Sequence, residues 1–290
     1  MKKKILITGS TGFIGSNIVS YLLKKNIYIY TLLRTKNKKN INLGRLKKNK
    51  NYKPIFFKNF KELEKKLKKL KIDIIINCAT YYSTKNDIQT IQNLIKTNVI
   101  FCSIVLEILN KKIKKFINFG SMMEYSRGNY FSPKNFYAIT KYSFQKIGEF
   151  YKLNNKRIKF YNLKLYETYG NNDKRKKIIP TIIKNYSKNK NTKIISKNLK
   201  MNFIHINSLT KAIKMIIYDK IKEGDYCLKN NKFTNIKYLI DSLNKKLSKK
   251  VKVKYLSSKK YFKNTVSLNK FPFWSDKEDL EKFILSQLKK

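Results

Sequence analysis

The sequence is poor in acidic residues, cysteine, proline and histidine, and these shortages narrow what the protein can be. It holds 17 Asp and Glu against 67 Lys and Arg, with one histidine, four prolines and three cysteines in 290 residues. Cys78, Cys102 and Cys227 are odd in number, widely spaced and without a CxxC pair. This usage argues against a disulfide framework and against a zinc site, so we expect no bound metal.

Long apolar runs are also scarce. No stretch approaches the roughly 20 consecutive apolar residues that cross a bilayer. The apolar run behind Met1–Lys4 stops at Thr8–Ser10, too early for a secretory signal. A hydrophobic content of 42% and an aromatic content of 13% are nevertheless typical of a globular protein. We therefore expect a soluble, cytoplasmic protein without a membrane partner.

The formal net charge of +50 has two interpretations. A basic surface is typical of proteins that bind nucleic acid or an anionic membrane. The alternative is a drift of composition towards Lys, Asn and Ile, as an AT-rich genome would encode. Arginine, which nucleic-acid sites recruit for its bidentate fork, is rare and occurs only at Arg34, Arg45, Arg127, Arg157 and Arg175. Because the lysines are spread over nearly every segment, we favour the drift and do not expect a nucleic-acid partner.

The first 165 residues alternate strand-like and helix-like segments. Apolar runs predict strands at 4–8, 27–33, 55–57, 74–78, 116–119 and 158–165, and helical segments are expected at 13–25, 61–70, 98–109 and 137–153. Buried strands that alternate with helices form βαβ units around a parallel sheet. We therefore predict an α/β fold, a Rossmann-type doubly wound parallel sheet with a smaller C-terminal α/β substrate lobe.

The second half has a looser pattern. It predicts helices at 178–186, 208–221 and 235–247, and short strands at 193–196, 202–206, 226–229 and 251–256. Ser275 and Glu278 have the spacing of a capping box and predict the start of the last helix. We place a dinucleotide-binding domain at residues 1–170 and a substrate-binding lobe at 171–290, with the strand near 202–206 returning to the first domain.

The segment Thr8–Gly15 carries glycines at spacings of three, directly after a strand and at the start of a helix. Gly9 permits a tight turn, Gly12 lets the backbone approach a diphosphate, and Gly15 allows close packing of helix on strand. The free N–H groups and the dipole of the helix N-terminus attract the anion. We expect a dinucleotide to bind against Gly9, Ser10, Thr11, Gly12, Phe13, Ile14 and Gly15.

The end of the second strand bears on which dinucleotide binds. An NAD site usually has Asp or Glu at this position, where the carboxylate bonds the ribose 2′-hydroxyl. Here the strand ends in Leu32-Leu33-Arg34, without a carboxylate. Because a guanidinium suits a 2′-phosphate, the sequence favours NADP(H) with Arg34 as the contact and leaves NAD(H) open.

Tyr137 and Lys141 lie four residues apart, which places them on one face of a predicted helix. Ser121 follows a strand at the carboxyl edge of the sheet, where ligand sites of such folds lie. A nearby ammonium favours the phenolate of Tyr137, so this phenol can exchange a proton with a carbonyl or alcohol oxygen near neutral pH. Ser121 would hold that oxygen. We predict that the three residues are catalytic and that Tyr137 and Lys141 also contact the cofactor.

Together these motifs resemble the extended short-chain dehydrogenase/reductases of the NAD-dependent epimerase/dehydratase group, over residues 4 to 245. The resemblance also covers Asn77–Thr80, Asn98, Leu163–Gly170 and Asn202–Ile206. It implies an NAD(P)-dependent enzyme that acts on a nucleotide sugar and forms a homodimer. It further implies cofactor contacts at Cys78, Ala79, Thr80 and Asn98, and substrate contacts at Tyr81, Met122, Met123, Glu167, Lys177 and Lys200.

Within this group the chain is similar to CDP-abequose and CDP-paratose synthases, which reduce a CDP-linked 4-keto sugar for surface polysaccharides. The 4,6-dehydratases carry an Asp-Glu pair after the Ser or Thr, where this chain has Met122 and Met123. Because thioethers cannot shuttle protons, this pair argues against dehydratase chemistry. The likeness to the synthases then implies a 4-keto reductase. The alternative is a 4-epimerase that retains NAD, and a distant alternative is a non-catalytic Rossmann protein that binds nucleic acid.

Two isolated polar residues are expected to lie apart from this chemistry. Glu124 comes one residue after the position of the dehydratase acid pair, so its side chain should point elsewhere. His205 is the only histidine and lies in an apolar strand, where a histidine is more often a core residue than a ligand. We give His205 no catalytic role.

Overall fold

The computed structural model describes residues 2–25, 27–34, 49–126, 128, 130–257 and 268–289. The chain divides into two compact units. Unit 1 consists of residues 1–164, 214–227 and 266–269, and unit 2 consists of 165–213, 228–265 and 270–290. The two units are therefore not simply the first and second halves of the chain, because unit 1 also includes later segments.

A sheet of seven strands forms the centre of unit 1, in the order β11-β6-β5-β4-β1-β2-β3. Its strands are β1 (Lys4–Thr8), β2 (Tyr28–Arg34), β3 (Tyr52–Phe57), β4 (Ile74–Asn77), β5 (Lys115–Ser121), β6 (Lys159–Leu165) and β11 (Gly224–Leu228). The pairings of β1 with β2 and β4, of β2 with β3, and of β4 with β5 are parallel. Every residue of β4 and β5 is buried, as expected of strands covered on both faces.

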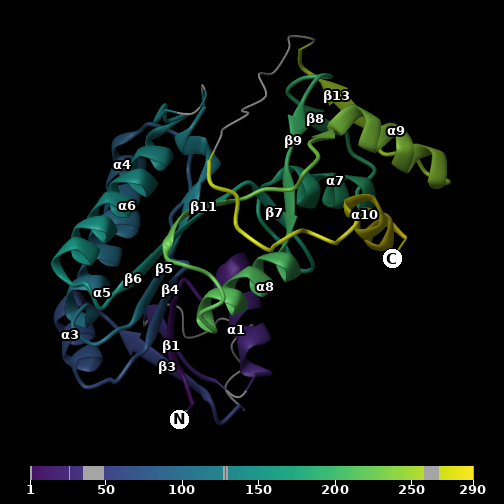
Figure 1. The fold of residues 1–290 in the computed structure, drawn as a ribbon. Helices are drawn as coiled ribbons and strands as arrows, with labels where there is room; N and C mark the ends of the chain where they lie inside the picture. The colour runs from purple at the N-terminus through teal and green to yellow at the C-terminus, as the bar shows by residue number, and fades with distance from the viewer. Residues whose placement is uncertain are drawn as a thin grey trace. The chain divides into compact units, whose positions relative to one another are not determined.

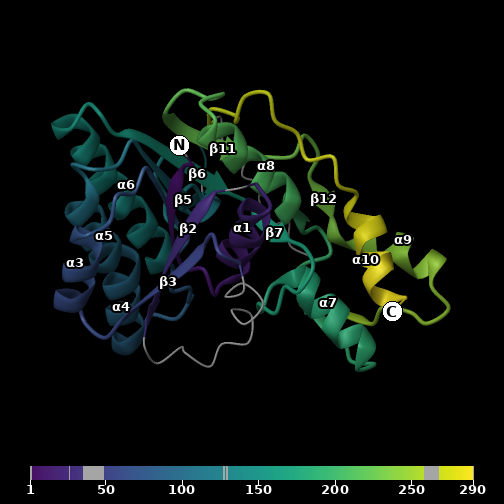
Figure 2. The same cartoon turned by 90° about the horizontal axis from the view of Figure 1, so that it is seen from below.

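Helices cover both faces of this sheet (Figures 1 and 2). On one face lie α3 (Phe60–Lys68), α4 (Ile88–Ile95), α5 (Cys102–Leu109) and α6 (Phe136–Asn154), and on the other lies α1 (Phe13–Leu23). Asn59, Asp87 and Asn135 cap α3, α4 and α6, because each side chain accepts a bond from a backbone N–H of the first turn. The predicted doubly wound α/β fold is thus confirmed.

The helix expected at 98–109 is longer than the sequence suggested. It starts at Ile88, after the Asp87 cap, and runs through a π-helical turn, η3 (Lys96–Phe101), into α5. By length and composition alone, Ile88–Leu109 would suffice to cross a membrane, although polar residues interrupt its apolar ones. In the structure its buried residues, among them Leu94, Val105 and Leu106, pack into the core of unit 1.

Unit 2 is built from short strands and four helices among the described residues. They are β7 (Glu167–Tyr169), α7 (Ile178–Ser187), β8 (Thr192–Ile194), β9 (Lys200–Met201), β10 (Phe203–His205), α8 (Ile206–Ile217), β12 (Thr234–Asn235), α9 (Ile236–Lys246), β13 (Val253–Tyr255) and α10 (Leu280–Leu288). β10 pairs in parallel with β7 and β13 with β8, while β12 and β9 are antiparallel. Ile182, Ile240, Leu243 and Ile284 lie in its core.

Two predictions for the second half are wrong. The strand near 202–206 pairs with β7 inside unit 2, and the later segments that belong to unit 1 are 214–227, which carries most of β11, and 266–269. The last helix begins at Leu280, with Asp279 as its cap, and not at the capping box predicted from Ser275. Asp276 holds this segment outside the helix, because its carboxylate accepts bonds from His205 N and Ser208 Oγ.

The structure confirms His205 as a core residue. Only 5% of it is exposed, and its ring packs against Tyr169 and Phe283 at centroid distances of 4.9 and 5.4 Å. Burial lowers the pKa of the imidazole, which favours the neutral form. His205 therefore contributes packing to unit 2.

Candidate active site

The turn after β1 requires two of its glycines. Gly9 has a φ of +62°, and a Cβ atom there would lie 2.5 Å from the backbone of Cys78 and Ala79. A Cβ atom at Gly15 would lie 2.3 Å from the carbonyl oxygen of Gly9. Gly12 is less confined, because the nearest atom to an added Cβ is Gly9 O at 3.3 Å. The roles expected for Gly9 and Gly15, a tight turn and close helix packing, match this geometry.

The same turn fits the diphosphate of a dinucleotide. Ser10 is 2% exposed, and its buried Oγ has no hydrogen-bond partner within the described residues. Gly12 precedes α1 and provides no side-chain cap to the helix N-terminus. A buried hydroxyl and a helix N-terminus without a side-chain cap both suit a bound anion. Thr11, Phe13 and Ile14 complete this turn.

A chain of buried amides ties the strand ends beside the turn. Thr8 Oγ1 donates to Asn77 Oδ1 at 2.7 Å and accepts from Ala79 N at 3.0 Å. Asn77 Nδ2 donates to Asn118 Oδ1 at 3.2 Å, and Asn118 Nδ2 donates to Asn162 Oδ1 at 2.8 Å. These bonds join β1, β4, β5 and β6. These hydrogen bonds were not predicted from the sequence, although an asparagine in each of three apolar strands is a signal that could have indicated them.

Asn98 fixes the loop that follows β4. Its Oδ1 accepts from Tyr81 N at 2.8 Å and from Thr80 Oγ1 at 3.2 Å, and its Nδ2 donates to Tyr81 O and Thr140 Oγ1, both at 3.0 Å. The amide thus connects this loop, which follows Cys78 and Ala79, to α6. Direct contact of Asn98, Cys78, Ala79 and Thr80 with the cofactor stays a prediction.

The three predicted catalytic residues lie at the end of β5 and at the start of α6. Ser121 is 8% exposed, and its Oγ accepts from Met123 N at 3.2 Å. Tyr137 and Lys141 lie one helical turn apart behind the Asn135 cap. Lys141 is 3% exposed, and burial lowers its pKa. The ring of Tyr82 contacts that of Tyr137 edge-on, at a centroid distance of 5.0 Å.

The carboxyl of Glu124 lies directly against Ser121. Ser121 N donates to Glu124 Oε1 at 2.7 Å, which together with the Met123 bond forms a capping box around η4 (Met122–Glu124). Glu124 is fully buried and therefore not directed at solvent. The expectation that Glu124 lies apart from the predicted catalytic residues is wrong, because its carboxyl accepts a bond from the backbone of Ser121.

The other predicted residues of unit 1 differ in exposure. Met122 is 6% exposed and its Sδ lies 3.5 Å from the Cys227 thiol, while Met123 Sδ accepts from Asn135 Nδ2 at 3.8 Å. Tyr81 is 37% exposed. Arg34 is exposed at the end of β2, opposite Phe57 of β3. Their contacts with substrate or cofactor stay predictions.

Unit 2 brings two of its three predicted substrate residues together. Lys177 Nζ lies 3.1 Å from Glu167 Oε1, and each side chain is 20% exposed. Lys200 is exposed at the first position of β9. The carboxylate of Glu167 therefore orients Lys177, the residue directly before α7.

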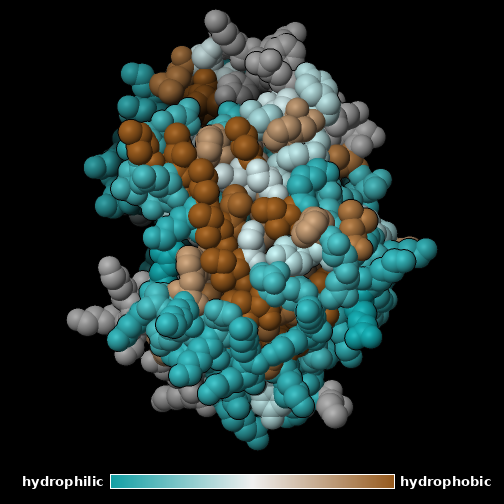
Figure 3. Space-filling view, turned by 90° about the vertical axis from the view of Figure 1, so that its left-hand side faces the viewer, coloured by the Kyte–Doolittle hydropathy of each residue, from teal (hydrophilic) through white to brown (hydrophobic). Residues whose placement is uncertain are grey.

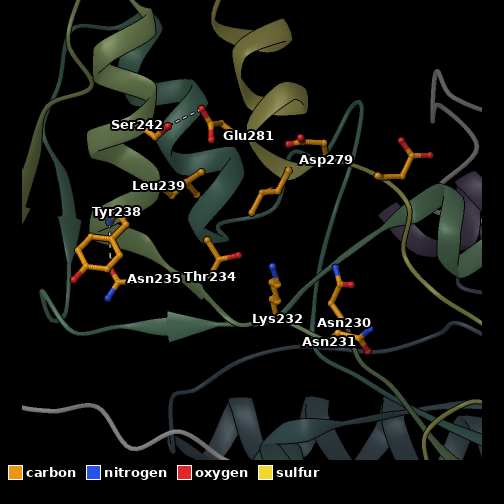
Figure 4. A pocket seen from close by; sticks show the side chains of 12 residues that line it. Asn230, Asn231, Lys232, Thr234, Asn235, Tyr238, Leu239, Ser242, Asp279 and Glu281 are labelled. Carbon is orange, nitrogen blue, oxygen red and sulfur yellow. Dashed lines mark hydrogen bonds between the residues drawn. The ribbon is translucent and has the colours of Figure 1, made fainter.

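A separate pocket of about 550 Å³ lies within unit 2, between α9 and the start of α10 (Figure 4). It is lined by polar residues together with Leu239 and Leu280, and the bond from Ser242 Oγ to Glu281 Oε1 at 2.8 Å crosses its upper side in that view. Its lining does not include the predicted site residues Glu167, Lys177 and Lys200. The pocket is thus distinct from the residues expected to bind substrate.

Comparisons with known proteins agree with this geometry. A model of the NAD dependent epimerase/dehydratase family matches residues 5–227. A CDP-abequose synthase of Yersinia pseudotuberculosis is 30% identical over 216 residues, covering 74% of this chain and 73% of the relative. A CDP-abequose synthase of Salmonella muenchen is 27% identical over 259 residues, covering 88% and 84%.

Among solved structures, the fold resembles the UDP-glucuronic acid 4-epimerase from Bacillus cereus in complex with UDP-glucuronic acid and NAD. The TM-score is 0.83 at 20% sequence identity, over 99% of this chain and 98% of the other. This likeness shows a shared fold.

Proposed function

The chain belongs to the NAD dependent epimerase/dehydratase family, and on this premise we propose that it is an NADPH-dependent reductase of a 4-keto nucleotide sugar. As a member of this family it is an NAD(P)-dependent enzyme of the oxidoreductase and epimerase type. The observation that supports a reductase over an epimerase is the end of β2, where Arg34 stands in place of a carboxylate, while the pair Met122-Met123 after Ser121 argues against a dehydratase. The named relatives, which are CDP-abequose synthases, support a CDP-linked substrate.

The residues of unit 1 can perform each proton step of such a reduction. The dinucleotide, when bound against Gly9–Gly15, supplies the hydride that reduces the keto carbon. Ser121 Oγ donates a hydrogen bond to the keto oxygen, and Tyr137 transfers its phenolic proton to that oxygen as it becomes an alkoxide. The ammonium of Lys141 stabilises the phenolate that remains. Tyr137 then regains a proton before the next turnover.

The same residues argue against dehydration. Loss of water from a sugar needs an acid and a base beyond the tyrosine. Met122 and Met123 offer only thioethers, and Met122 is buried against Cys227. Glu124 is bonded to Ser121 N and fully buried. Reduction requires neither of these missing groups.

We assign the preference for NADPH to Arg34. Its guanidinium is exposed at the end of β2, where a 2′-phosphate can form charge-assisted hydrogen bonds with it. Replacement of Arg34 by Leu should raise the Kd for NADPH by about tenfold and leave that for NADH unchanged. Isothermal titration of both cofactors measures this, and an equal effect on the two would exclude the assignment.

We propose substrate contacts for Tyr81, Met122 and Met123 and, separately, for Glu167, Lys177 and Lys200. Tyr81 and Met123 would contact the sugar from unit 1, and Met122 would support them from the core. Lys177, oriented by Glu167, and Lys200 offer ammonium groups for the diphosphate of the nucleotide.

The direct experiment is incubation of the protein with NADPH and, in turn, CDP-, dTDP-, UDP- and GDP-linked 4-keto sugars. We expect the absorbance of reduced nicotinamide to fall with the CDP-linked sugar. A 4-epimerase, which uses the same three residues, would instead be purified with NAD bound and would consume no NADPH. Bound NAD without NADPH consumption would replace the reductase by that alternative.

We also propose that the protein is a soluble, cytoplasmic homodimer. Apolar side chains gather on the face of unit 1 that α4, α5 and α6 cover (Figure 3). The exposed members on α4, η3 and α6 are Ile88, Ile95, Ile100, Ile139, Phe150 and Leu153. A second copy of the chain would cover this face. Sedimentation should give a dimer for the wild-type chain and a monomer for Ile100→Lys, and a wild-type monomer would refute it.

A further inference from the structure

A cluster of buried charged side chains surrounds Glu124, and the proposed chemistry leaves it without a role. Glu124 and Lys164 both have 0% side-chain exposure, and Lys164 Nζ lies 4.0 Å from Glu124 Oε2. Lys164 Nζ also donates to Gln145 Oε1 at 2.9 Å and forms an ion pair with Asp225. Asp225 connects the cluster to solvent, because 36% of its side chain is exposed.

The two carboxyl oxygens of Glu124 have different surroundings. Oε1 accepts from Ser121 N at 2.7 Å, whereas Oε2 has no hydrogen-bond partner in the part of the chain that the structure describes. A charged oxygen is costly to bury without a donor. Burial accordingly raises the pKa of Glu124 to about 7, against the opposing effect of Lys164. The carboxyl therefore changes charge near neutral pH.

Gly120 shows how closely this cluster is packed against β5. A Cβ atom at Gly120 would lie 3.0 Å from Glu124 Oε1, 3.1 Å from Lys164 Cγ and 3.2 Å from Asn162 Nδ2. Because Gly120, the residue before Ser121, has no side chain, the carboxyl of Glu124 has space to lie against β5. Glu124 is confined in this position and cannot turn to solvent without disturbing β5.

The distribution of charge couples Glu124 to Lys141. Both Lys141 and Lys164 are buried, and Lys164 has a surface partner of its own. The groups whose negative charge would favour the ammonium of Lys141 are Glu124, Cys78 and Cys102. Burial raises the pKa of both thiols, so they are neutral near pH 7. Among these three groups, Glu124 is the one that carries a negative charge at neutral pH.

We propose that Glu124 is a positioning residue whose ionised carboxyl fixes Ser121 and keeps Lys141 charged, so that its protonation sets the pH dependence of catalysis. This inference rests on the proposed roles of Ser121, Tyr137 and Lys141. When Glu124 takes up a proton, Lys141 loses its counter-charge and its own pKa falls, so that it more readily releases to solvent the proton whose charge stabilises the phenolate of Tyr137. The proton comes from solvent and returns to it, so the step needs no further reactant.

Several elements contribute charged or titratable groups around Glu124. They are Lys141 on α6, Lys164 on β6, Asp225 on β11, the neighbouring Tyr125, and Glu149 on α6, which accepts from Gln145 Nε2 at 2.8 Å. Burial raises the pKa of Tyr125, which therefore stays neutral. The lysines favour the ionised carboxyl of Glu124, whereas Asp225 opposes it. The direction in which a substitution shifts the pKa of Glu124 therefore tests the inference.

The first test is Glu124→Gln, which keeps an acceptor for Ser121 N but cannot ionise. In the wild-type enzyme kcat should rise with pH through an apparent pKa of about 7. In the variant this rise should vanish, and kcat near pH 8 should fall by about tenfold while KM changes little. Glu62→Gln, a surface residue paired with Lys66 on α3, is the matched control. A rise that persists in Glu124→Gln overturns the proposal.

The second test is Asp225→Asn. Loss of this negative charge stabilises the ionised form of Glu124, so the rise in kcat should move to lower pH by about half a unit or more. A merely structural role for the cluster gives no reason for a shift in that direction. A shift to higher pH, or none, contradicts the coupling, and the result stands even if Glu124→Gln fails to fold.

Nitrogen NMR of the Lys141 side chain in the ligand-free protein separates this inference from the proposed function. The pKa of Lys141 should fall by about one unit in Glu124→Gln, whether or not any nucleotide sugar is reduced. If the pKa of Lys141 falls in Glu124→Gln but the protein has no reductase activity, only the proposed function is refuted. An unchanged Lys141 in an active reductase would sink the coupling alone.

Discussion

Unit 1 and unit 2 hold their candidate site residues in different ways. In unit 1, Ser121, Lys141 and Asn98 are 8%, 3% and 1% exposed, and Ser121 and Asn98 are fixed by hydrogen bonds to neighbouring elements. In unit 2, Glu167 and Lys177 are each 20% exposed and bond to one another, and Lys200 is exposed. Groups that move protons need fixed geometry, whereas groups that recognise a flexible diphosphate can adapt. The contrast suggests that the chemistry lies in unit 1 and substrate discrimination in unit 2.

The sharpest way to test this contrast is Tyr137→Phe. Loss of the phenolic proton should lower kcat by about 10²- to 10⁴-fold and leave the Kd for NADPH within about twofold, because the ring remains. Steady-state kinetics and cofactor titration provide both values. Tyr142→Phe, on the same helix, should retain wild-type activity. Equal losses in the two variants would remove Tyr137 from the chemistry.

Replacement of the turn glycines separates folding from cofactor binding in unit 1. A Cβ at Gly12 meets only Gly9 O, at 3.3 Å, so Gly12→Ala should fold normally but raise the Kd for the dinucleotide by about a hundredfold, or roughly 3 kcal/mol. Gly15→Ala places its Cβ 2.3 Å from Gly9 O and should also reduce stability by about 1–3 kcal/mol. Calorimetric titration and thermal unfolding measure the two effects. Unaltered cofactor binding in Gly12→Ala would contradict this use of the turn.

The buried carboxyl of Glu124 in unit 1 should change how the free energy of unfolding depends on pH. The pKa of Glu124 is raised from 4.5 to about 7, so the folded state holds a proton that the unfolded state loses between these values. Stability from this group is complete below about pH 4.5 and declines as pH rises through about 7. Glu124→Gln should therefore be more stable near pH 8 by about 2 kcal/mol, although less active. Denaturant unfolding across pH measures this, and a less stable variant at that pH would be inconsistent with a costly buried charge.

The smallest effect is expected in unit 2, from Lys177→Gln. If Lys177 contacts the diphosphate as proposed, removal of its ammonium should raise KM for the nucleotide sugar by about tenfold while kcat stays nearly constant. Initial rates over a range of sugar concentrations give both constants. Lys184→Gln, exposed on α7, is the control and should behave like the wild-type chain. A loss confined to kcat would place Lys177 in the chemistry and blur the distinction between the units.

The same contrast explains what the sequence could predict. Apart from β11, the strands of unit 1 have four to seven residues and apolar runs, so these runs located them, together with Thr8–Gly15 and Tyr137. The strands of unit 2 have two or three residues, too few for any period, and the return of residues 214–227 to unit 1 has no local signal. The helix start at Asp279 depends on Asp276, whose partners are about 70 residues away.

The cluster around Glu124 could not be predicted for a related reason. Its members come from η4, α6, β6 and β11, and only the fold brings Lys164 and Asp225 beside Glu124. By contrast, Tyr137 and Lys141 belong to one helical turn, so their spacing is visible in the chain itself. Residues within one helix can be related by their spacing in the sequence, whereas residues that the fold brings together from several elements cannot.

The central claim is that hydride passes from added NADPH to a keto sugar while Tyr137 supplies the proton. Its most direct test is to supply NADPH deuterated at C4 on the transferred side together with a CDP-linked 4-keto sugar, and to analyse the product by mass spectrometry and NMR. We predict one deuterium at the sugar C4 for each NADPH consumed. A product without deuterium, formed with no loss of NADPH, would contradict the account.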